Sequence, residues 1–172
     1  TVHDEPWQQQ KYIVCNADEG DSGTFADRLA MECDPYMLIE GMTIAGLAVG
    51  ATQGFIYLRS EYPVAHRILN EAIRRAEAEG YLGQDVRGSG RAFHLEVRLA
   101  AGAYICGEET SLLESLEGKR GLVRAKPPLP AIKGLFGQPT VVNNVLSFAA
   151  VPFILAKGGQ AYADYGMGKS RG

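Results

Sequence analysis

Short apolar runs alternate with longer stretches of helical periodicity in the first part of the chain, and this order constrains the fold more than any other feature. Residues 11–15 and 53–59 have the length and the β-branched and aromatic side chains typical of strands. In residues 93–99 apolar and polar side chains alternate, which is the pattern of a half-exposed strand. Strands that alternate with helices predict a layered α/β fold, with a largely parallel sheet and helices on both faces.

The segments between these runs have the periodicity of helices. Residues 24–33 carry apolar side chains at helical spacing, with Ser22 or Thr24 as the expected N-cap. Residues 35–49 are apolar almost all round, which predicts a helix inside the core. Residues 63–79 place apolar side chains on one side and charges on the other, as a helix on the surface of a sheet does.

The second half of the chain is less regular. We expect a helix over residues 108–116 and another near residues 142–157, the latter ended by two glycines. Between them, residues 118–139 contain four prolines and no helical or strand pattern. An irregular stretch of this length inside a compact domain is more often functional than idle.

Composition narrows the class of protein. The 172 residues are 46% hydrophobic and 22% charged, which suits one soluble globular domain over residues 1–172. The net charge of −3 and the lack of a Lys/Arg run argue against a nucleic-acid partner. The longest apolar-rich stretch, residues 36–51, is broken by glycines and falls short of the roughly 20 residues that span a bilayer, so no direct membrane insertion is expected.

The cysteines and the termini indicate the cellular context. Cys15, Cys33 and Cys106 are odd in number and match no disulfide, zinc or iron–sulfur spacing, so we expect no metal site and a reducing, cytoplasmic compartment. The polar segment 1–10 does not have the pattern of a signal peptide. The chain does not begin with Met, and we expect it to be a piece of a longer protein.

Two loops, residues 16–24 and 102–109, each follow a predicted strand and open a helix. In an open α/β sheet, ligands bind at the carboxyl ends of the strands, where helix N-termini converge. The polar side chains of these loops include Asn16, Asp18, Glu19 and Asp21 in the first, and Glu108 and Glu109 in the second. Such groups accept hydrogen bonds from sugar hydroxyls or ring N–H groups, and a nucleotide-like ligand would satisfy this arrangement. The alternative is that the carboxylates other than Glu19 only stabilise helix N-termini.

Other candidate motifs are weaker. The acidic residues 18–21 lack the spacing of a calcium loop, and residues 163–170 fit only a loose phosphate-loop pattern with no strand before them. The glycines of residues 88–90 precede a strand and therefore mark a turn. Cys106 is expected to be a buried or cofactor-facing thiol, because its acidic neighbours oppose a thiolate. The amides at 143–144 are either a helix cap or ligand contacts.

Three segments resemble one family closely: YIVCNADEGDSGT at residues 12–24, GAYICGEET at residues 102–110 and PTVVNNV at residues 139–145. The family is the FMN- and NADH-binding flavoprotein subunit shared by respiratory complex I, NAD-reducing hydrogenases and NAD-dependent formate dehydrogenases. The resemblance runs in order along nearly the whole chain. Residues 19–24 and 166–172 are most similar to the beta subunit of soluble formate dehydrogenase.

This resemblance implies a Rossmann-like FMN-binding domain that works as a diaphorase module. Hydride would pass between NAD(H) and FMN, and electrons would leave to iron–sulfur clusters in other parts of a multi-subunit oxidoreductase, in the cytoplasm or peripheral to the inner membrane. A glycine-rich loop would precede Thr1, and a 4Fe–4S cluster would lie in a later domain. Leu129 differs from the aromatic residue that many complex I relatives carry at this position.

The resemblance also implies roles for individual residues. Asn16, Asp18 and Glu19 would line the flavin, with Asp21 towards the dinucleotide. Tyr104, Gly107 and Glu108 would flank the flavin ring, with Gly102 also among the cofactor-binding residues. Glu109 would hold the nicotinamide side, Lys126 would reach the adenine-nucleotide side, and Asn143 and Asn144 would bond the ribityl-phosphate end. No protein acid or base is needed for the chemistry, because the cofactor performs it. The competing hypotheses are a nucleotide-binding regulatory module without turnover and a degenerate structural remnant.

Overall fold

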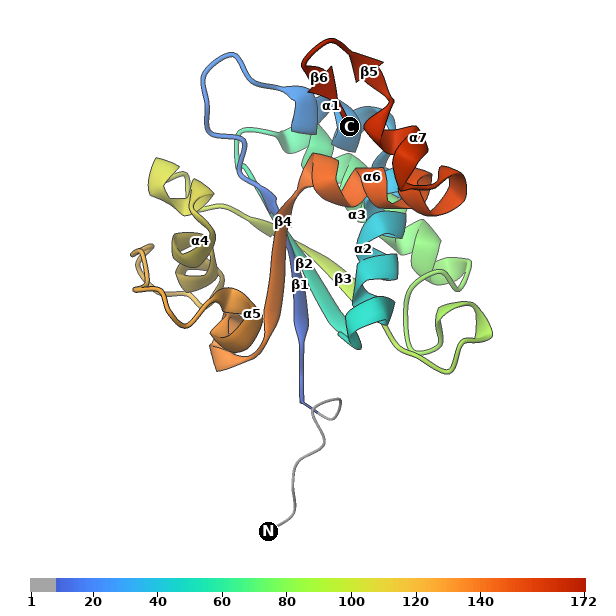
Figure 1. The fold of residues 1–172 in the computed structure, drawn as a ribbon. Coiled ribbons are helices and arrows are strands. Elements are labelled where there is room, and N and C mark those ends of the chain that lie inside the picture. The colour runs from blue at the N-terminus through green and yellow to red at the C-terminus, as the bar shows by residue number, and fades with distance from the viewer. Residues whose placement is uncertain (1–8) are drawn as a thin grey trace.

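The computed structural model describes residues 9–172 and contains a four-stranded parallel sheet (Figure 1). The strands are β1 (Tyr12–Ala17), β2 (Gln53–Leu58), β3 (His94–Leu99) and β4 (Thr140–Asn144), in the order β3-β2-β1-β4. All three pairings are parallel, which confirms the α/β prediction. Most of the polar segment 1–10, in which no leader was expected, lies outside the described residues.

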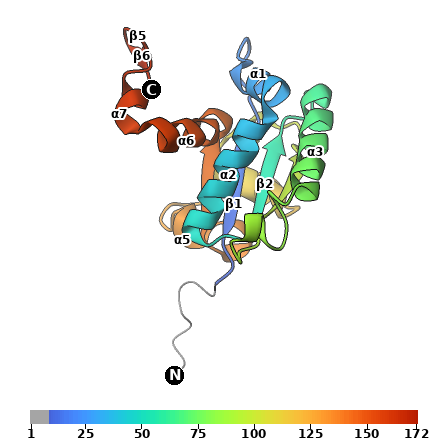
Figure 2. The same ribbon diagram turned by 90° about the vertical axis from the view of Figure 1, so that its right-hand side faces the viewer.

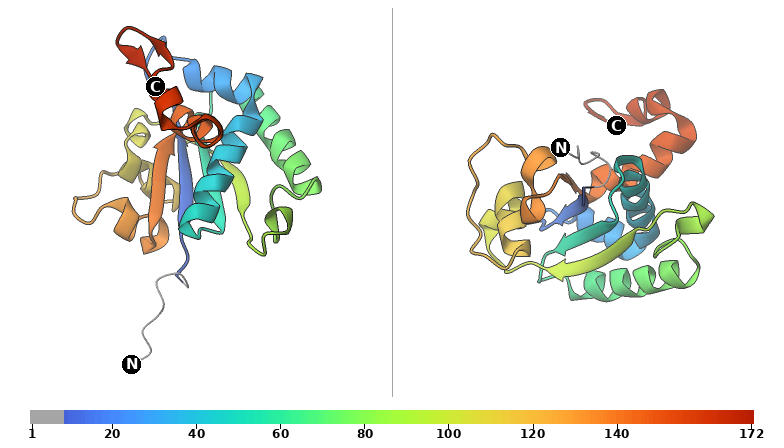
Figure 3. Two further views of the ribbon diagram at one scale, coloured as in Figure 1. Left: turned by 45° about the vertical axis from the view of Figure 1, so that its right-hand side comes forward. Right: turned by 90° about the horizontal axis from the view of Figure 1, so that it is seen from below.

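Helices cover both faces of the sheet, as Figure 3 shows from below. They are α1 (Ala26–Cys33), α2 (Pro35–Val49), α3 (Pro63–Ala78), α4 (Glu109–Leu116), α5 (Pro130–Lys133), α6 (Val145–Lys157) and α7 (Gly159–Ala163). Short 3-10 helices are η1 (Val86–Gly88), η2 (Tyr104–Gly107) and η3 (Leu135–Gly137), and β5 (Gly166–Met167) pairs with β6 (Ser170–Arg171). Helix α7 and this hairpin extend beyond α6, away from the sheet (Figure 2).

The sheet divides the apolar core in two because successive strand residues point to opposite faces. Along β1, Ile13 and Cys15 pack into the core beneath α1, α2, α3 and α6, whereas Val14 packs with Leu112 and Leu113 of α4. All of these side chains are fully buried. The near-continuous apolar sequence of β1 is therefore explained by burial on both faces.

The start of the last helix was predicted wrongly. Residues 142–144 belong to strand β4, and α6 begins at Val145. The β-branched residues Thr140–Val142 suit a strand, but the apolar helix pattern that follows hides its end, and only pairing with β1 shows it. Asn144 is the N-cap of α6, since its side chain accepts a hydrogen bond from the Ser147 N–H at 2.9 Å. The irregular stretch 118–139 also contains the short helices α5 and η3.

The strand order creates a point at which the chain reverses direction across the sheet. The connections run outward from β1 to β2 and β3, and the chain then returns across the other face to β4, beside β1. Loops that follow neighbouring strands diverge at such a point and leave a crevice outside the carboxyl ends.

Within the described residues, no helix has the length and apolar character needed to cross a membrane.

Candidate functional site

A cavity of about 550 Å³ lies at the carboxyl ends of the strands. The loop between β1 and α1, the segment between β3 and α4, and the junction of β4 with α6 line it. Eight of the residues singled out by the sequence and the resemblance are in its lining: Asn16, Asp18, Glu19, Asp21, Tyr104, Gly107, Glu108 and Asn144. The two strand-end loops that the sequence singled out therefore line one cavity.

Four of the suggested residues lie outside this lining. Glu109 is next to Glu108 in the first turn of α4, and the exposed Asn143 precedes Asn144 on β4. Gly102 has φ +81° in the turn after β3. Lys126 reaches the site from the 118–139 segment through ion pairs with Glu108 and Glu109.

Glu19 stabilises the N-terminus of α1 from a distance in sequence. Its carboxylate accepts the Asp27 N–H at 2.7 Å and the Arg28 N–H at 3.4 Å, both in the first turn of the helix. The expected caps at Ser22 and Thr24 are wrong, because Phe25 occupies the N-cap position and has no capping side chain. Glu19 therefore satisfies helix donors that a local cap would otherwise satisfy.

The same carboxylate binds a buried phenol. The Tyr62 hydroxyl donates to Glu19 Oε1 at 2.8 Å, and burial followed by this hydrogen bond raises the pKa of Tyr62 to about 12. The Arg59 guanidinium donates to the Glu19 backbone carbonyl. Glu19 is thus held by α1 and by the connection between β2 and α3, and its carboxylate oxygens are largely used within the protein.

Asp21 and Tyr104 join the two loops across the cavity. The Tyr104 hydroxyl donates to Asp21 Oδ1 at 3.0 Å, and this hydrogen bond raises the pKa of Tyr104. The Tyr104 ring is 74% exposed, and a Cβ placed on Gly20 would lie only 3.1 Å from it. An aromatic face beside the cavity is therefore open to stacking by a flat ligand.

Glu108 is the N-cap of α4. Its Oε2 accepts the N–H groups of Thr110 and Ser111 at 2.8 and 2.9 Å, as well as the Thr110 hydroxyl. Burial alone would raise the pKa of Glu108, but these hydrogen bonds and the ammonium of Lys126 outweigh it and lower the pKa. The alternative interpretation, stabilisation of a helix N-terminus, is confirmed for this residue. Its Oε1 faces Lys126 at 3.2 Å.

Asn16 and Gly107 lie next to each other in the lining of the cavity. Asn16 Nδ2 donates to the Gly107 carbonyl at 2.8 Å, which ties the end of β1 to η2. A Cβ on Gly107 would lie 3.9 Å from the Asp18 carbonyl oxygen and 4.0 Å from Asp18 Oδ2. A glycine at this position leaves the cavity open without being required by the backbone conformation, since its φ is not positive.

Asp27 is a cavity residue that the sequence analysis missed. It stands in the first turn of α1, where a carboxylate is ordinary, and only the fold of the 16–24 loop brings it to the cavity. Burial, followed by the charge of Glu19, raises the pKa of Asp27 from 3.8 to about 6. Burial also raises the pKa of Asp18, which Arg59 partly opposes.

The charge of the lining has a consequence for ligands. Five carboxylates line the cavity, those of Asp18, Glu19, Asp21, Asp27 and Glu108, and no Lys or Arg among the described residues does so. Among these residues no three His, Cys, Asp or Glu side chains are placed to share a metal ion. The cavity therefore suits the hydrogen-bond donors of a ring or polyol better than a phosphate group.

The sequence matches the family described as the Nuo51 FMN-binding domain over residues 2–153. The chain belongs to this family. An NADH-quinone oxidoreductase subunit of Aquifex aeolicus is 53% identical over 91% of the chain, and the NADP-reducing hydrogenase subunit HndC of Solidesulfovibrio fructosivorans is 48% identical over 95% of it. These matches cover 37% and 33% of the two relatives, so the chain spans about a third of their length.

A solved structure shares the fold. The chain superposes on a chain of an NAD⁺-reducing [NiFe]-hydrogenase in the H₂-reduced state with a TM-score of 0.84 and 40% identity. The match covers 99% of this chain and 28% of the hydrogenase chain. The resemblance to the flavoprotein family is thereby confirmed, and so is the expected Rossmann-like arrangement of this FMN-binding domain family.

We expect Asp27→Asn to stabilise the domain in a pH-dependent way. Because the pKa of Asp27 is higher in the folded state, the free energy of unfolding falls as pH rises from about 4 to about 6. Above about pH 6 the protein keeps the full loss of stability. Removing the charge should therefore raise the free energy of unfolding by about 1–3 kcal/mol at pH 7.5, and by much less at pH 4. Urea unfolding of the intact, flavin-free protein, followed by circular dichroism at both pH values, measures this. An equal gain at both values would contradict the assigned pKa.

Proposed function

We propose that this domain binds FMN in the cavity at the carboxyl ends of β1, β3 and β4, and that the bound flavin exchanges a hydride with NAD(H). One observation carries the proposal. The chain belongs to the Nuo51 FMN-binding domain family, and the segments that the resemblance assigns to the flavin line one cavity. At Gly107 this cavity is lined by a residue without a side chain, which leaves room for a ligand. A volume of about 550 Å³ lies within the range of about 300–1,000 Å³ typical of cofactor sites.

The hydrogen-bonding groups of the cavity fit the ring and the sugar-like chain of FMN. Asp18 is buried beside the open face of Gly107, where its carboxylate can accept a ring N–H or a ribityl hydroxyl. Tyr104 supplies an exposed aromatic face at the rim. Asn16 has its amide N–H₂ fixed by the Gly107 carbonyl, so its orientation is set before a ligand arrives.

The phosphate end of the cofactor needs a different surface, because the cavity lining is acidic. We place it at the N-terminus of α6, where Asn144 caps the helix and Asn143 is exposed at the end of β4. Backbone N–H groups and the helix dipole favour an anion there. The glycine-rich loop implied by the resemblance would complete the phosphate site from outside residues 1–172.

The dinucleotide would approach over α4. Glu109 and Lys126 stand beside Glu108 at the rim, where Glu109 would orient the nicotinamide side and Lys126 would reach the adenine-nucleotide side. Asp21, held by Tyr104, would face the dinucleotide from the opposite loop. These side chains bind and orient, and none is required to transfer a proton.

FMN, when bound, accepts a hydride from NADH and releases the two electrons singly, so the protein supplies binding, orientation and electrostatics. The carboxylates around the cavity would oppose an additional negative charge on the ring and thereby shift its reduction potential. In the intact protein, electrons would pass to iron–sulfur clusters, including a 4Fe–4S cluster outside residues 1–172.

The larger assembly is also a proposal. We infer that the domain is part of a multi-subunit oxidoreductase, located in the cytoplasm or peripheral to the inner membrane. A formate dehydrogenase is the candidate suggested by residues 19–24 and 166–172. The relatives named above belong to an NADH-quinone oxidoreductase and a hydrogenase, which make these two assemblies the alternatives.

The flavin released from the intact protein tests cofactor binding. We expect acid denaturation to release FMN, identified by chromatography against FAD and riboflavin, in a ratio of about one per chain, as a single preformed site requires. A protein that contains no flavin and does not bind added FMN would contradict the proposal and favour a nucleotide-binding module without turnover or a structural remnant.

A further inference from the structure

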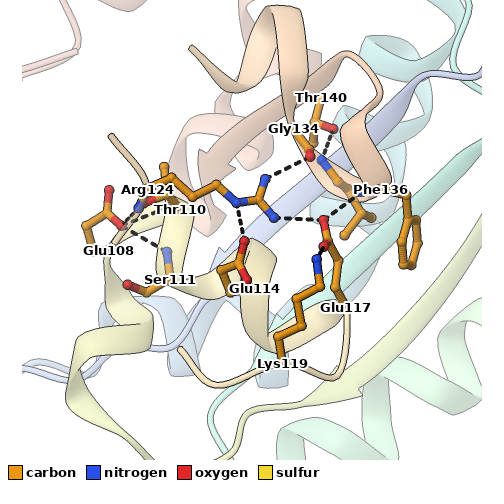
Figure 4. A network of polar contacts seen from close by, with 11 residues as sticks. Glu108, Thr110, Ser111, Glu114, Glu117, Lys119, Arg124, Gly134, Phe136 and Thr140 are labelled. Carbon is orange, nitrogen blue, oxygen red and sulfur yellow. Dashed lines mark hydrogen bonds and ion pairs between the residues drawn. The ribbon is translucent and has the colours of Figure 1, made fainter. Parts of the chain in front are cut away.

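Arg124 fastens the segment between α4 and β4, residues 118–139, to α4 and to the part of the segment that returns toward β4. Arg124 lies near the start of the segment, which crosses the α4 face of the sheet (Figure 1). Its guanidinium contacts α4 on one side and the returning part of the segment on the other, as Figure 4 shows. No sequence pattern marks this residue, because its partners are 7 to 14 positions away.

Each of the three guanidinium nitrogens of Arg124 donates a hydrogen bond. Nε donates to Glu114 of α4, Nη2 donates to Glu117 at 2.7 Å, and Nη1 donates to the Gly134 carbonyl at 2.9 Å. The side chain of Glu117 is only 6% exposed, and its Oε1 also accepts the Phe136 N–H at 2.7 Å. A planar fork that reaches two carboxylates and a carbonyl fixes its own position, which the single ammonium of a lysine does not do.

The backbone of Arg124 continues this network into the site. Its N–H donates to the Thr110 hydroxyl at 3.0 Å, and that hydroxyl donates to Glu108. Thr110 is buried, so this path is shielded from water. The carboxylate of Glu108, which lines the cavity, is thereby connected to Arg124 through the side chain of Thr110.

The residues between the two fixed points form a short, stiff tip. Between Arg124 and Gly134, the chain contains Pro127, Pro128 and Pro130, whose fixed φ angles limit its freedom. The tip carries Lys126, two residues after Arg124, and the ammonium of Lys126 forms ion pairs with Glu108 and Glu109. Gly134 permits the return, because a Cβ there would lie 2.5 Å from the Thr140 side chain.

We propose that Arg124 is a positioning residue for the nicotinamide dinucleotide: it contacts neither cofactor nor substrate, and it acts by holding Lys126 in place beside Glu108 at the rim of the cavity. This inference rests on the proposed function and adds to it a residue that controls the affinity for the dinucleotide. If the backbone of Lys126 were free to move, binding of the dinucleotide would have to order that backbone and the long lysine side chain. The entropy lost in this ordering would lower the affinity for the dinucleotide.

A double-mutant cycle tests this in the intact, flavin-loaded protein, with ferricyanide as electron acceptor. Arg124→Lys retains the charge and loses the fork, and we expect it to raise KM for NADH about 5–10-fold while kcat changes less than about twofold. Lys126→Met should raise KM similarly. If Arg124 acts through Lys126, adding Arg124→Lys to Lys126→Met should raise KM by less than about twofold more.

Lys119→Met is the matched control. Lys119 also pairs with Glu117, at 2.7 Å, but it is largely exposed and contacts neither Thr110 nor Gly134. We expect its KM and kcat to equal those of the unmodified protein. Hydrogen exchange of the flavin-free protein gives a readout without turnover: Arg124→Lys should speed exchange in residues 122–126, and Lys119→Met should leave it unchanged.

The outcomes separate this inference from the proposed function. Multiplicative effects of the two substitutions on KM, or an equal loss of kcat and flavin in Arg124→Lys, would overturn the positioning role and leave a structural one. Unchanged exchange in residues 122–126 would also overturn it. Failure of NADH to reduce a flavin-loaded, unmodified protein would instead overturn the proposed function, whatever the exchange data show.

Discussion

Gly107→Leu should abolish flavin binding and leave the fold intact. Gly107 lines the cavity, and a Cβ placed there meets its nearest atoms, both of Asp18, at 3.9 and 4.0 Å, which is ordinary van der Waals contact. The larger side chain therefore has room at its base and extends into the space that the proposed flavin ring occupies. We expect flavin content to fall more than about tenfold, because overlap with a ligand ring costs several times the roughly 1.4 kcal/mol that each factor of ten requires.

Flavin absorbance per chain and urea unfolding of the intact protein measure the two parts of this result. The matched control is Ala103→Leu, since Ala103 is exposed in the same segment and does not line the cavity. It should retain its flavin. A Gly107→Leu protein with full flavin content would place the cofactor elsewhere, for example in the groove of about 940 Å³ between α2 and α3.

Gly41→Ala should strongly destabilise the packing of α2 against α6, on the opposite face of the sheet from α4. Helix α2 crosses α6 so closely at Gly41 that a Cβ there would lie 1.9 Å from the Phe148 carbonyl oxygen and 2.7 Å from its carbonyl carbon. Both atoms belong to the backbone of α6, so no side-chain rotation can relieve the overlap. We expect a loss of about 3 kcal/mol or more in the free energy of unfolding, at the upper end of the cost of overpacking.

This substitution should also weaken flavin binding, because α6 carries the Asn144 cap into the site. Gly159→Ala is a suitable control, since its Cβ would meet no atom within 4 Å. Its free energy of unfolding in urea should stay within about 0.5 kcal/mol of that of the unmodified protein, as is usual for surface positions. A Gly41→Ala protein of normal stability would show that α2 and α6 do not pack this closely.

Sequence patterns predicted the parts of the fold that depend on neighbouring residues. The apolar runs at β1 and β2 and the two-sided pattern of α3 specify their structure locally, and the two loops singled out after β1 and β3 line one cavity. Strand β4 was missed because its identity depends on pairing with β1, from Tyr12 with Thr140 to Asn16 with Asn144. Pairing across more than a hundred residues leaves no periodic signal in a five-residue segment.

The same limit explains the site residues that were missed. Asp27 has the sequence context of an ordinary first-turn acid, and its place in the cavity depends on Glu19 reaching over from the preceding loop. Arg124 has no local pattern either, since its partners come from α4 and from Gly134. Conversely, Glu108 was expected at the site and also caps α4, so one carboxylate fits both interpretations.

The central claim is that this domain holds a flavin that NADH reduces. The most direct measurement is the visible spectrum of the intact protein, recorded without oxygen before and after adding NADH in stoichiometric steps. We expect flavin absorption bands that bleach as NADH is added, and recovery of the bands on adding an oxidant. A flavin-loaded protein whose bands do not change with NADH would contradict the claim.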